Sequence, residues 1–168
     1  LSNTYLLEKE YDWTGIIAEP LPIWHFDLHK NRNCIIENRC LWSKSGEILE
    51  FLDVKESEYS TIKMYQNTDQ HSIKRKKSKI INVETISLFD LLKFHNAPEI
   101  IDYMSVDTEG SELEILLNFP FEHFKFNLIS IEHNYGPSRQ KLRKLLQKNG
   151  YKPFLEDLSK WDDWFVPI

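Results

Sequence analysis

Short, largely apolar segments that each end in a polar tip constrain the fold of this chain more than any other feature. Three examples are the runs that precede Glu19, Asp107 and Glu132. Short apolar runs are typical of strands buried on both faces, as in parallel sheets. Helix-like segments alternate with these runs. The alternation predicts an open α/β fold with a mostly parallel central sheet and helices on both faces.

Helix start and stop signals place the predicted elements. Ser87 followed by Asp90 forms a capping box that opens one helix, and Gly150 is placed to end another. Helices are predicted over the first dozen residues, with Ser2 near the cap, and over 22–31, 88–95, 112–118 and 138–149. Strands are predicted over 15–19, 34–37, 79–83, 100–106 and 126–131, with a hairpin over 40–54 and an antiparallel edge formed by 151–155 and 164–168.

Composition and charge narrow the class of protein. The chain has 168 residues, of which 41% are hydrophobic, and this suits one packed domain rather than a disordered chain. A net charge of −5 argues against a general nucleic-acid binder, and no apolar stretch is long enough to cross a bilayer. Cys34 and Cys40 are too few for a disulfide scaffold and lack zinc-ligand spacing. We therefore expect two buried thiols in a reducing, cytoplasmic setting.

Residues 55–79 form the most polar part of the chain. The segment carries several serines and the basic run 74–77. We predict a long, exposed, flexible loop here. The basic run has two interpretations, namely a solvated group of charges or a clamp for a phosphorylated or acidic substrate.

In open α/β sheets, ligands bind outside the carboxyl ends of the strands, so the strand tips are the candidate site. Glu19 ends its strand where an acid can accept hydrogen bonds from the ribose of a nucleoside cofactor, or where it merely caps the next helix. The sequence leaves both readings open. The third tip is Glu132-His133-Asn134, in which His133 has more polar neighbours than an isolated structural histidine.

The second tip, 107–114, contains four carboxylates in eight residues. Asp107 and Glu109 are predicted at the strand tip and turn, where Gly110 permits a sharp entry into the next helix. Glu112 and Glu114 are expected to face solvent from that helix. A calcium loop does not fit, because the glycine and the closing glutamate are not where such a loop needs them.

Four stretches of the chain resemble the FkbM family of methyltransferases. They are Ser-Asn-Thr-Tyr-Leu-Leu-Glu from residue 2, Trp-Thr-Gly-Ile-Ile-Ala-Glu-Pro ending at Pro20, Ile-Asp-Tyr-Met-Ser-Val-Asp-Thr-Glu-Gly-Ser-Glu from residue 101, and Ile-Ser-Ile-Glu-His-Asn ending at Asn134. The third stretch is the most specific, because it ends the predicted strand where the family carries this element. The similarity runs over nearly the whole chain and is weakest over 43–79.

The resemblance implies a Rossmann-like fold, S-adenosylmethionine as methyl donor, and a hydroxyl group of a sugar, glycan or natural product as acceptor. It also implies roles for single residues. On the cofactor side, Glu19 would hold the ribose and Asn38 would lie near the adenine, with Ser2 and Pro20 beside the cofactor. Asp107 would lie near the reactive methyl group, and the acceptor side would be lined by Glu109, His133 and Asn134.

The chain departs from the family at its start. Members carry a central first strand that ends in a glycine-rich loop, just before the Ser-Asn-Thr-Tyr helix. This chain has five glycines, and the closest pair is Gly136 and Gly150. We therefore expect a single methyltransferase domain over 1–168 that is incomplete at its N-terminus, lacks the first strand, and has a sheet split at that place.

Methyl transfer to oxygen needs alignment of the reacting atoms and removal of the hydroxyl proton. Either Asp107 or His133 is predicted to be the base. Alternatively, Mg²⁺ held by Asp107, Glu132 and Asn134 would activate the acceptor. Two other classes of function stay open at this point, a non-catalytic α/β module that binds a glycan or protein, and another nucleotide-dependent α/β enzyme such as a dehydrogenase. The sequence does not indicate an oligomeric state.

Overall fold

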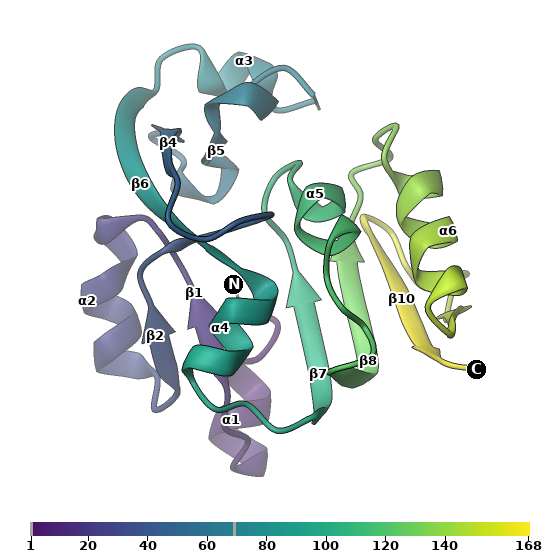
Figure 1. The fold of residues 1–168 in the computed structure, drawn as a ribbon. Coiled ribbons are helices and arrows are strands. Elements are labelled where there is room, and N and C mark those ends of the chain that lie inside the picture. Colours follow the sequence, from purple (N-terminus) through teal and green to yellow (C-terminus); the bar gives the residue numbers. More distant parts are fainter. Residues whose placement is uncertain (1, 69) are drawn as a thin grey trace.

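A computed structural model describes residues 2–68 and 70–168 and shows a mixed α/β fold (Figure 1). The described strands form three separate sheets. In the first, β1 (Ile16–Ala18) pairs in parallel with β2 (Ile35–Glu37), and Ala18 lies opposite Glu37. Both strands are short and largely apolar, as the sequence predicts.

The largest hydrophobic core is built on the second sheet, whose strand order is β7-β8-β10-β9. β7 (Ile100–Val106) and β8 (Lys125–Glu132) are parallel. β10 (Asp162–Pro167) runs antiparallel to both β8 and β9 (Tyr151–Phe154). The predicted antiparallel edge at the C-terminus is therefore confirmed, although β10 begins two residues earlier than expected.

The third sheet has the order β3-β6-β4-β5 and corrects the predicted hairpin over 40–54. β3 (Cys40–Trp42) and β4 (Ile48–Asp53) do not pair with each other, because β6 (Lys79–Ser87) lies between them. The nine residues of β6 are enough to pair with both neighbours. Its first six residues are antiparallel to β4, and its last three are parallel to β3.

The prediction of one mostly parallel sheet is wrong for the described residues. Parallel pairs occur in all three sheets, but β4, β5, β9 and β10 run antiparallel to their neighbours. The sheet is split as expected, because β1 and β7 are edge strands of different sheets. Side chains still bridge the split, since Asn3 Nδ2 donates a 2.9 Å hydrogen bond to Ser105 Oγ on β7.

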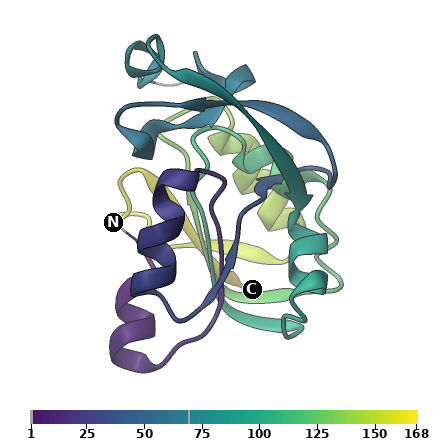
Figure 2. The same ribbon diagram turned by 90° about the vertical axis from the view of Figure 1, so that its left-hand side faces the viewer.

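The described part of the chain contains six α-helices. They are α1 (Tyr5–Tyr11), α2 (Pro22–Asn31), α3 (Ser72–Arg75), α4 (Leu88–Phe94), α5 (Glu112–Leu117) and α6 (Arg139–Lys148). In Figure 2, α1 and α2 lie on one side of the strands and α4 on the other, as predicted. No helix in the described part of the chain is long and apolar enough to cross a membrane.

Caps explain where several helices begin and end. Ser87 Oγ accepts the backbone N–H of Asp90, which confirms the predicted start of α4. Gly150 follows α6 with φ = +87°, a left-handed conformation that suits glycine. Ser2 lies near the cap of α1 as predicted, because Thr4 is the cap residue, and Ser2 Oγ accepts a hydrogen bond from Arg32.

Two hydrophobic cores hold these layers together. The main core contains the fully buried side chains of Leu116, Phe126, Ile129, Leu146 and Phe165, from both strands and helices. A smaller core is formed mainly by side chains of the third sheet, among them Trp42 and Phe51. The third sheet is thus a packed unit beside the main one.

The segment 55–79 is more structured than a simple loop. It contains two 3₁₀ turns, η1 (Ser57–Tyr59) and η2 (Lys63–Tyr65), together with β5 (Thr61–Ile62) and α3. The basic run at 74–77 is exposed except at Arg75, of which only 2% is accessible. This one buried cation means that the run is not a uniformly solvated group of charges.

Candidate active site

The carboxyl ends of β1, β2, β7 and β8 point to the same edge of the molecule, and Figure 1 shows their arrowheads pointing in one direction. The three polar tips found in the sequence all lie at this edge. Glu19 follows β1, Asp107 follows β7, and Glu132 is the last residue of β8. The strand-tip reasoning therefore placed these residues correctly with respect to the sheets.

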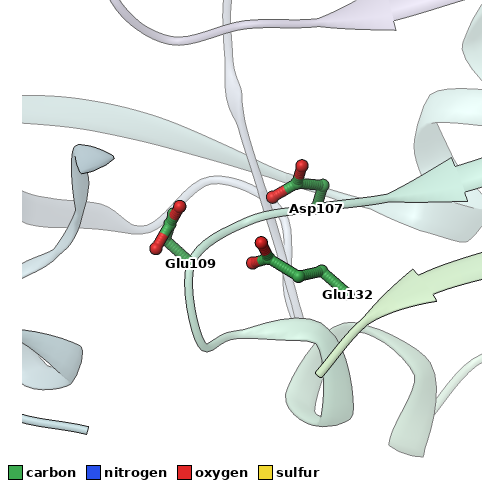
Figure 3. Close-up of side chains that lie close together, drawn as sticks. All are labelled: Asp107, Glu109 and Glu132. Atoms are coloured by element: carbon green, nitrogen blue, oxygen red, sulfur yellow. The ribbon is translucent and has the colours of Figure 1, made fainter. Parts of the chain in front are cut away.

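Three carboxylates from this edge form a cluster, which Figure 3 shows in close-up. One oxygen from each of Asp107, Glu109 and Glu132 lies within 4.8 Å of the others. Asp107 is exposed, Glu132 is half-buried and Glu109 is buried. The cluster is thus open to solvent on the Asp107 side and closed on the Glu109 side.

The crowding of like charges changes how these groups titrate. Burial raises the pKa of Glu132, and the negative charges of Asp107 and Glu109 raise it further. Burial also raises the pKa of Asp107, while a hydrogen-bonding interaction with Glu132 opposes that shift. Because Asp107 touches solvent, we expect its carboxylate to ionise before that of Glu132. The repulsion among these carboxylates therefore favours a proton on Glu132 beside Asp107.

The turn after β7 is ordered by Glu112, which the sequence placed in solvent. That expectation is wrong, since only 3% of Glu112 is accessible. Its Oε1 accepts hydrogen bonds from the backbone N–H groups of Thr108 and Gly110 and from the hydroxyl of Thr108. A carboxylate that accepts the free N–H groups of this turn fixes the path of the chain from Asp107 into α5.

Glu109 is the most constrained member of the cluster. Its φ of +57° lies in the left-handed region, which is unusual for a residue other than glycine. The carbonyl of Glu109 accepts a hydrogen bond from Thr61 Oγ1 (2.9 Å), and its Oε2 accepts one from Arg75 Nη2 (2.8 Å). Residues from the polar 55–79 segment therefore line this side of the site. This contact was not predicted from the sequence.

His133 lies at the same strand end but is turned inward. Only 1% of its side chain is accessible, and its Nδ1 accepts the backbone N–H of Tyr135. The ring proton therefore lies on Nε2, which is 3.6 Å from Asp163 Oδ1. Burial lowers the pKa of His133. Asn134, at φ = +42°, donates its backbone N–H to the carbonyl of Trp161.

Asp162 is a fourth carboxylate near the cluster that the sequence analysis missed. It is the first residue of β10 and pairs with Glu132 across the sheet. Burial raises its pKa, and the charges of Asp107 and Asp163 add to the effect. The predicted strand started at Trp164, so the acid at the start of β10 lay outside it.

The residues predicted to contact the cofactor lie around the ends of β1 and β2. Glu19 Oε1 accepts the backbone N–H of Leu21, and Leu21 is the cap residue of α2. This contact is compatible with the helix-capping interpretation of Glu19, while ribose binding stays a prediction. Burial raises the pKa of Glu19. Pro20 is half-buried, and Asn38 is exposed just beyond β2.

Glu37 is a further acid at the end of β2 that the sequence analysis did not select. It pairs with Arg39 and with His95 on the far side of the β2 tip. The hydrogen bond from Arg39, opposed by burial, is the main reason that the pKa of Glu37 falls to about 2. Because Arg39 and His95 both contact the carboxylate of Glu37, this side chain anchors the turn between β2 and β3.

Ser2 is held beside the split between the sheets. Its hydroxyl accepts a 2.9 Å hydrogen bond from the buried Arg32, and the neighbouring Asn3 reaches β7. Ser2, Glu19 and Asn38 therefore lie on the β1–β2 side, while the carboxylate cluster lies on the β7–β8 side. The resemblance assigns the first of these sides to the cofactor and the second to the acceptor, and both assignments stay predictions.

Comparison with known proteins adds independent support. A model of the methyltransferase FkbM domain matches residues 1–153, which is most of the chain and includes every residue of the carboxylate cluster. No curated protein and no solved structure shows significant similarity. Membership of this family implies S-adenosylmethionine as the methyl donor and a Rossmann-like fold. The chain belongs to the FkbM family, and it is a methyltransferase.

Proposed function

We propose that this protein is an O-methyltransferase that transfers the methyl group of S-adenosylmethionine to a hydroxyl of a sugar, glycan or natural product, with Asp107 as the base. One observation carries the proposal. An exposed carboxylate, Asp107, stands at the carboxyl end of β7, with Glu132 and Glu109 close enough to control its proton. A base must be accessible to the acceptor, and of these three side chains only Asp107 is exposed.

The chemistry requires one displacement and one proton transfer. The acceptor oxygen attacks the methyl carbon, the bond from that carbon to sulfur breaks, and sulfur keeps the electron pair to give S-adenosylhomocysteine. The hydroxyl proton moves to a carboxylate oxygen of Asp107. The protonated Glu132 helps to keep Asp107 ionised, because a neutral neighbour can donate a hydrogen bond to it where a second anion would repel it.

The geometry favours Asp107 over His133 as the base. The Nδ1 atom of His133 is occupied by the N–H of Tyr135, and the side chain is buried. A histidine in this state supports the turn after β8 and does not face an incoming substrate. His133 is better suited to holding Asn134 and Tyr135 in their left-handed conformations.

The donor set also fits a divalent cation. Of the predicted ligands, Asp107 and Glu132 bring carboxylate oxygens within 4.8 Å of each other and of Glu109, and such oxygens are the ligands that Mg²⁺ prefers. Asn134, the third predicted ligand, follows His133 at the same strand end. A cation would offset the repulsion among these carboxylates, which together with burial raises the pKa of Glu132. A bound Mg²⁺ would lower the pKa of an acceptor hydroxyl. In either version, the protein residues orient the acceptor and receive its proton.

Exposed aromatic rings beside the cluster support a sugar-like acceptor. Tyr135 and Trp161 are 65% and 52% accessible. They lie together with the β8 tip, because the carbonyl of Trp161 accepts the N–H groups of His133 and Asn134. Flat aromatic surfaces next to polar groups are suited to sugar rings, which have one apolar face and hydroxyls at the edge.

A binding experiment tests the cofactor class. Calorimetric titration of the full-length protein with S-adenosylhomocysteine, S-adenosylmethionine and NAD should show binding of the two sulfur nucleosides and none of NAD. Binding of NAD alone would favour another nucleotide-dependent enzyme. Binding of none of the three would favour a non-catalytic module and end the proposal.

A transfer experiment tests the base and the metal. Radiolabelled S-adenosylmethionine is incubated with a panel of sugars, glycosides and small phenols, with and without EDTA. Asp107→Asn should lower turnover by about 10²- to 10⁴-fold while keeping affinity for S-adenosylhomocysteine. Asp102→Asn is the matched control. Asp102 is an exposed residue nearer the start of the same strand, so this variant should retain activity. Full activity in EDTA rejects the metal version, and unchanged turnover in Asp107→Asn rejects the base.

A further inference from the structure

The buried ion pair between Arg75 and Glu109 joins two parts of the chain that are far apart in sequence. Arg75 Nη2 lies 2.8 Å from Glu109 Oε2, and the two side chains are 1% and 9% accessible. Arg75 also donates from Nε to the carbonyl of Tyr59 (2.9 Å). One guanidinium group therefore ties the carboxylate cluster to the segment that contains η1, β5, η2 and α3.

The neighbours of Arg75 in sequence show that this burial is specific. Lys74, Lys76 and Lys77 are all exposed. Burying a single arginine from a basic run is costly unless its charge is compensated. The carboxylate of Glu109 provides that compensation. Arg75 is consequently held by a buried ion pair, whereas Lys74 is exposed and lies over the ring of Tyr59.

Two further contacts hold the same surfaces together. Thr61 Oγ1 donates a hydrogen bond to the carbonyl of Glu109. A Cβ atom at Gly110 would lie 3.1 Å from Thr68 Oγ1 and 3.2 Å from Tyr65 Cβ, so the backbone passes very close to the η2 turn. Three contacts thus hold Glu109 in its left-handed conformation: the ion pair of its side chain, the hydrogen bond to its carbonyl, and the close packing of Gly110.

We propose that Arg75 is a positioning residue of the active site, which holds Glu109 and the 107–111 turn in place and makes residues 57–68 and 70–75 one wall of the acceptor site. The inference rests on the proposed function, because it assigns the carboxylate cluster to catalysis. Arg75 acts through Glu109 and does not contact the reacting atoms. Glu109 is the member of the cluster that bridges this wall and the strand tips.

The kinetic test compares Arg75→Met, Arg75→Lys and the matched control Lys77→Met, with the acceptor found in the panel above. We expect Arg75→Met to lower kcat about 10- to 100-fold, because a small displacement of a catalytic group costs this much. The KM for S-adenosylmethionine should stay within about twofold. Arg75→Lys should recover part of kcat, since it restores the charge without the planar fork, and Lys77→Met should behave like wild type.

A second variant keeps the inference testable if Arg75→Met does not fold. Glu109→Gln preserves the shape of the side chain and removes its charge. We expect it to lower kcat by a similar factor, and the Arg75→Met, Glu109→Gln double variant to be no worse than the more damaging single variant. Variants that melt at lower temperature but turn over within twofold of wild type would show that the pair is merely structural.

Hydrogen exchange separates this inference from the proposed function. In Arg75→Met and in Glu109→Gln, peptides that cover 57–75 and 107–111 should both exchange faster, while peptides within β8 are unchanged. This readout does not require activity. If wild type fails to bind S-adenosylhomocysteine, the proposed function is wrong. If exchange in 107–111 is unaffected by Arg75→Met, the coupling is wrong.

Discussion

The buried contact between Glu8 and Arg32 offers a direct test of how the N-terminal helix is held. Glu8 Oε2 lies 2.7 Å from Arg32 Nε, and the two side chains are 6% and 4% accessible. Glu8 Oε1 accepts the backbone N–H of Asn33 at 2.8 Å. Arg32 also donates to the hydroxyls of Ser2 and Thr4. We predict that Glu8→Gln loosens α1 from the start of β2.

The magnitude follows from the pKa of Glu8. Burial alone would raise this pKa, but the hydrogen bonds from Asn33 and Arg32 outweigh burial and lower it from 4.5 to about 2. A shift of one pKa unit corresponds to about 1.4 kcal/mol, so the ionised form stabilises the fold by about 3 kcal/mol. For a domain of this size, that loss lowers the melting temperature by roughly 6–12 °C.

The pH dependence gives the sign of the effect. The folded-state pKa of Glu8 is below its unfolded-state value, so its contribution is fully present above about pH 4.5 and is lost as the pH falls towards 2. The difference in the free energy of unfolding between wild type and Glu8→Gln should therefore be about 3 kcal/mol at pH 7. It should shrink steadily as the pH falls below 4.5.

Urea unfolding of both proteins between pH 3 and pH 7, followed by circular dichroism, measures this difference. Glu10→Gln is a suitable control, because Glu10 lies on the same helix and is exposed. A difference at pH 7 below about 0.5 kcal/mol, the range of ordinary surface substitutions, would refute the assigned burial of the pair. A difference that is equally large at pH 3 would refute the electrostatic origin.

Two other substitutions test the main core and the anchoring of β10. Phe165→Ala removes a fully buried ring and should lower the free energy of unfolding by about 3–5 kcal/mol, whereas Phe154→Ala, at an exposed ring on the edge strand, should cost about 1 kcal/mol or less in the same urea titration. Asp163→Asn removes the anion that Arg139 and Arg143 share and should cost about 3 kcal/mol, because two partly buried cations are left without it. A loss below about 1 kcal/mol in thermal or urea unfolding would contradict that account.

The positions at which the strands end could be predicted, because they depend on residues that are close together in sequence. The last residues of β7 include the buried Met104 and Val106, and the chain leaves the sheet at the polar Asp107 that follows them. The start of α4 was equally predictable, since Ser87 and Asp90 satisfy each other within one turn. Features of this kind depend on neighbours in sequence and on the period of the element.

The pairing of β3, β4 and β6 could not be predicted in the same way. The segment 40–54 has the alternation and the central glycine of a hairpin, and that local pattern favours pairing of its two halves. β6 offers a longer partner for each half, and the pairing energy of nine residues outweighs the local preference. Arg75 was missed for a related reason, because its partner Glu109 lies 34 residues away.

The carboxylates of the site show which ligands are found by inspecting the carboxyl ends of parallel strands and which are not. Parallel strands bring their carboxyl ends together, so this inspection finds Asp107 and Glu132. An antiparallel strand brings its start to the same edge, and Asp162, at the start of β10, lies opposite Glu132 for this reason. A search for ligands in such folds should therefore include the first residues of antiparallel strands beside the parallel set. In this protein, that step adds a carboxylate whose pKa is raised by burial and by the charge of Asp107, and the site is more acidic than its parallel strands alone indicate.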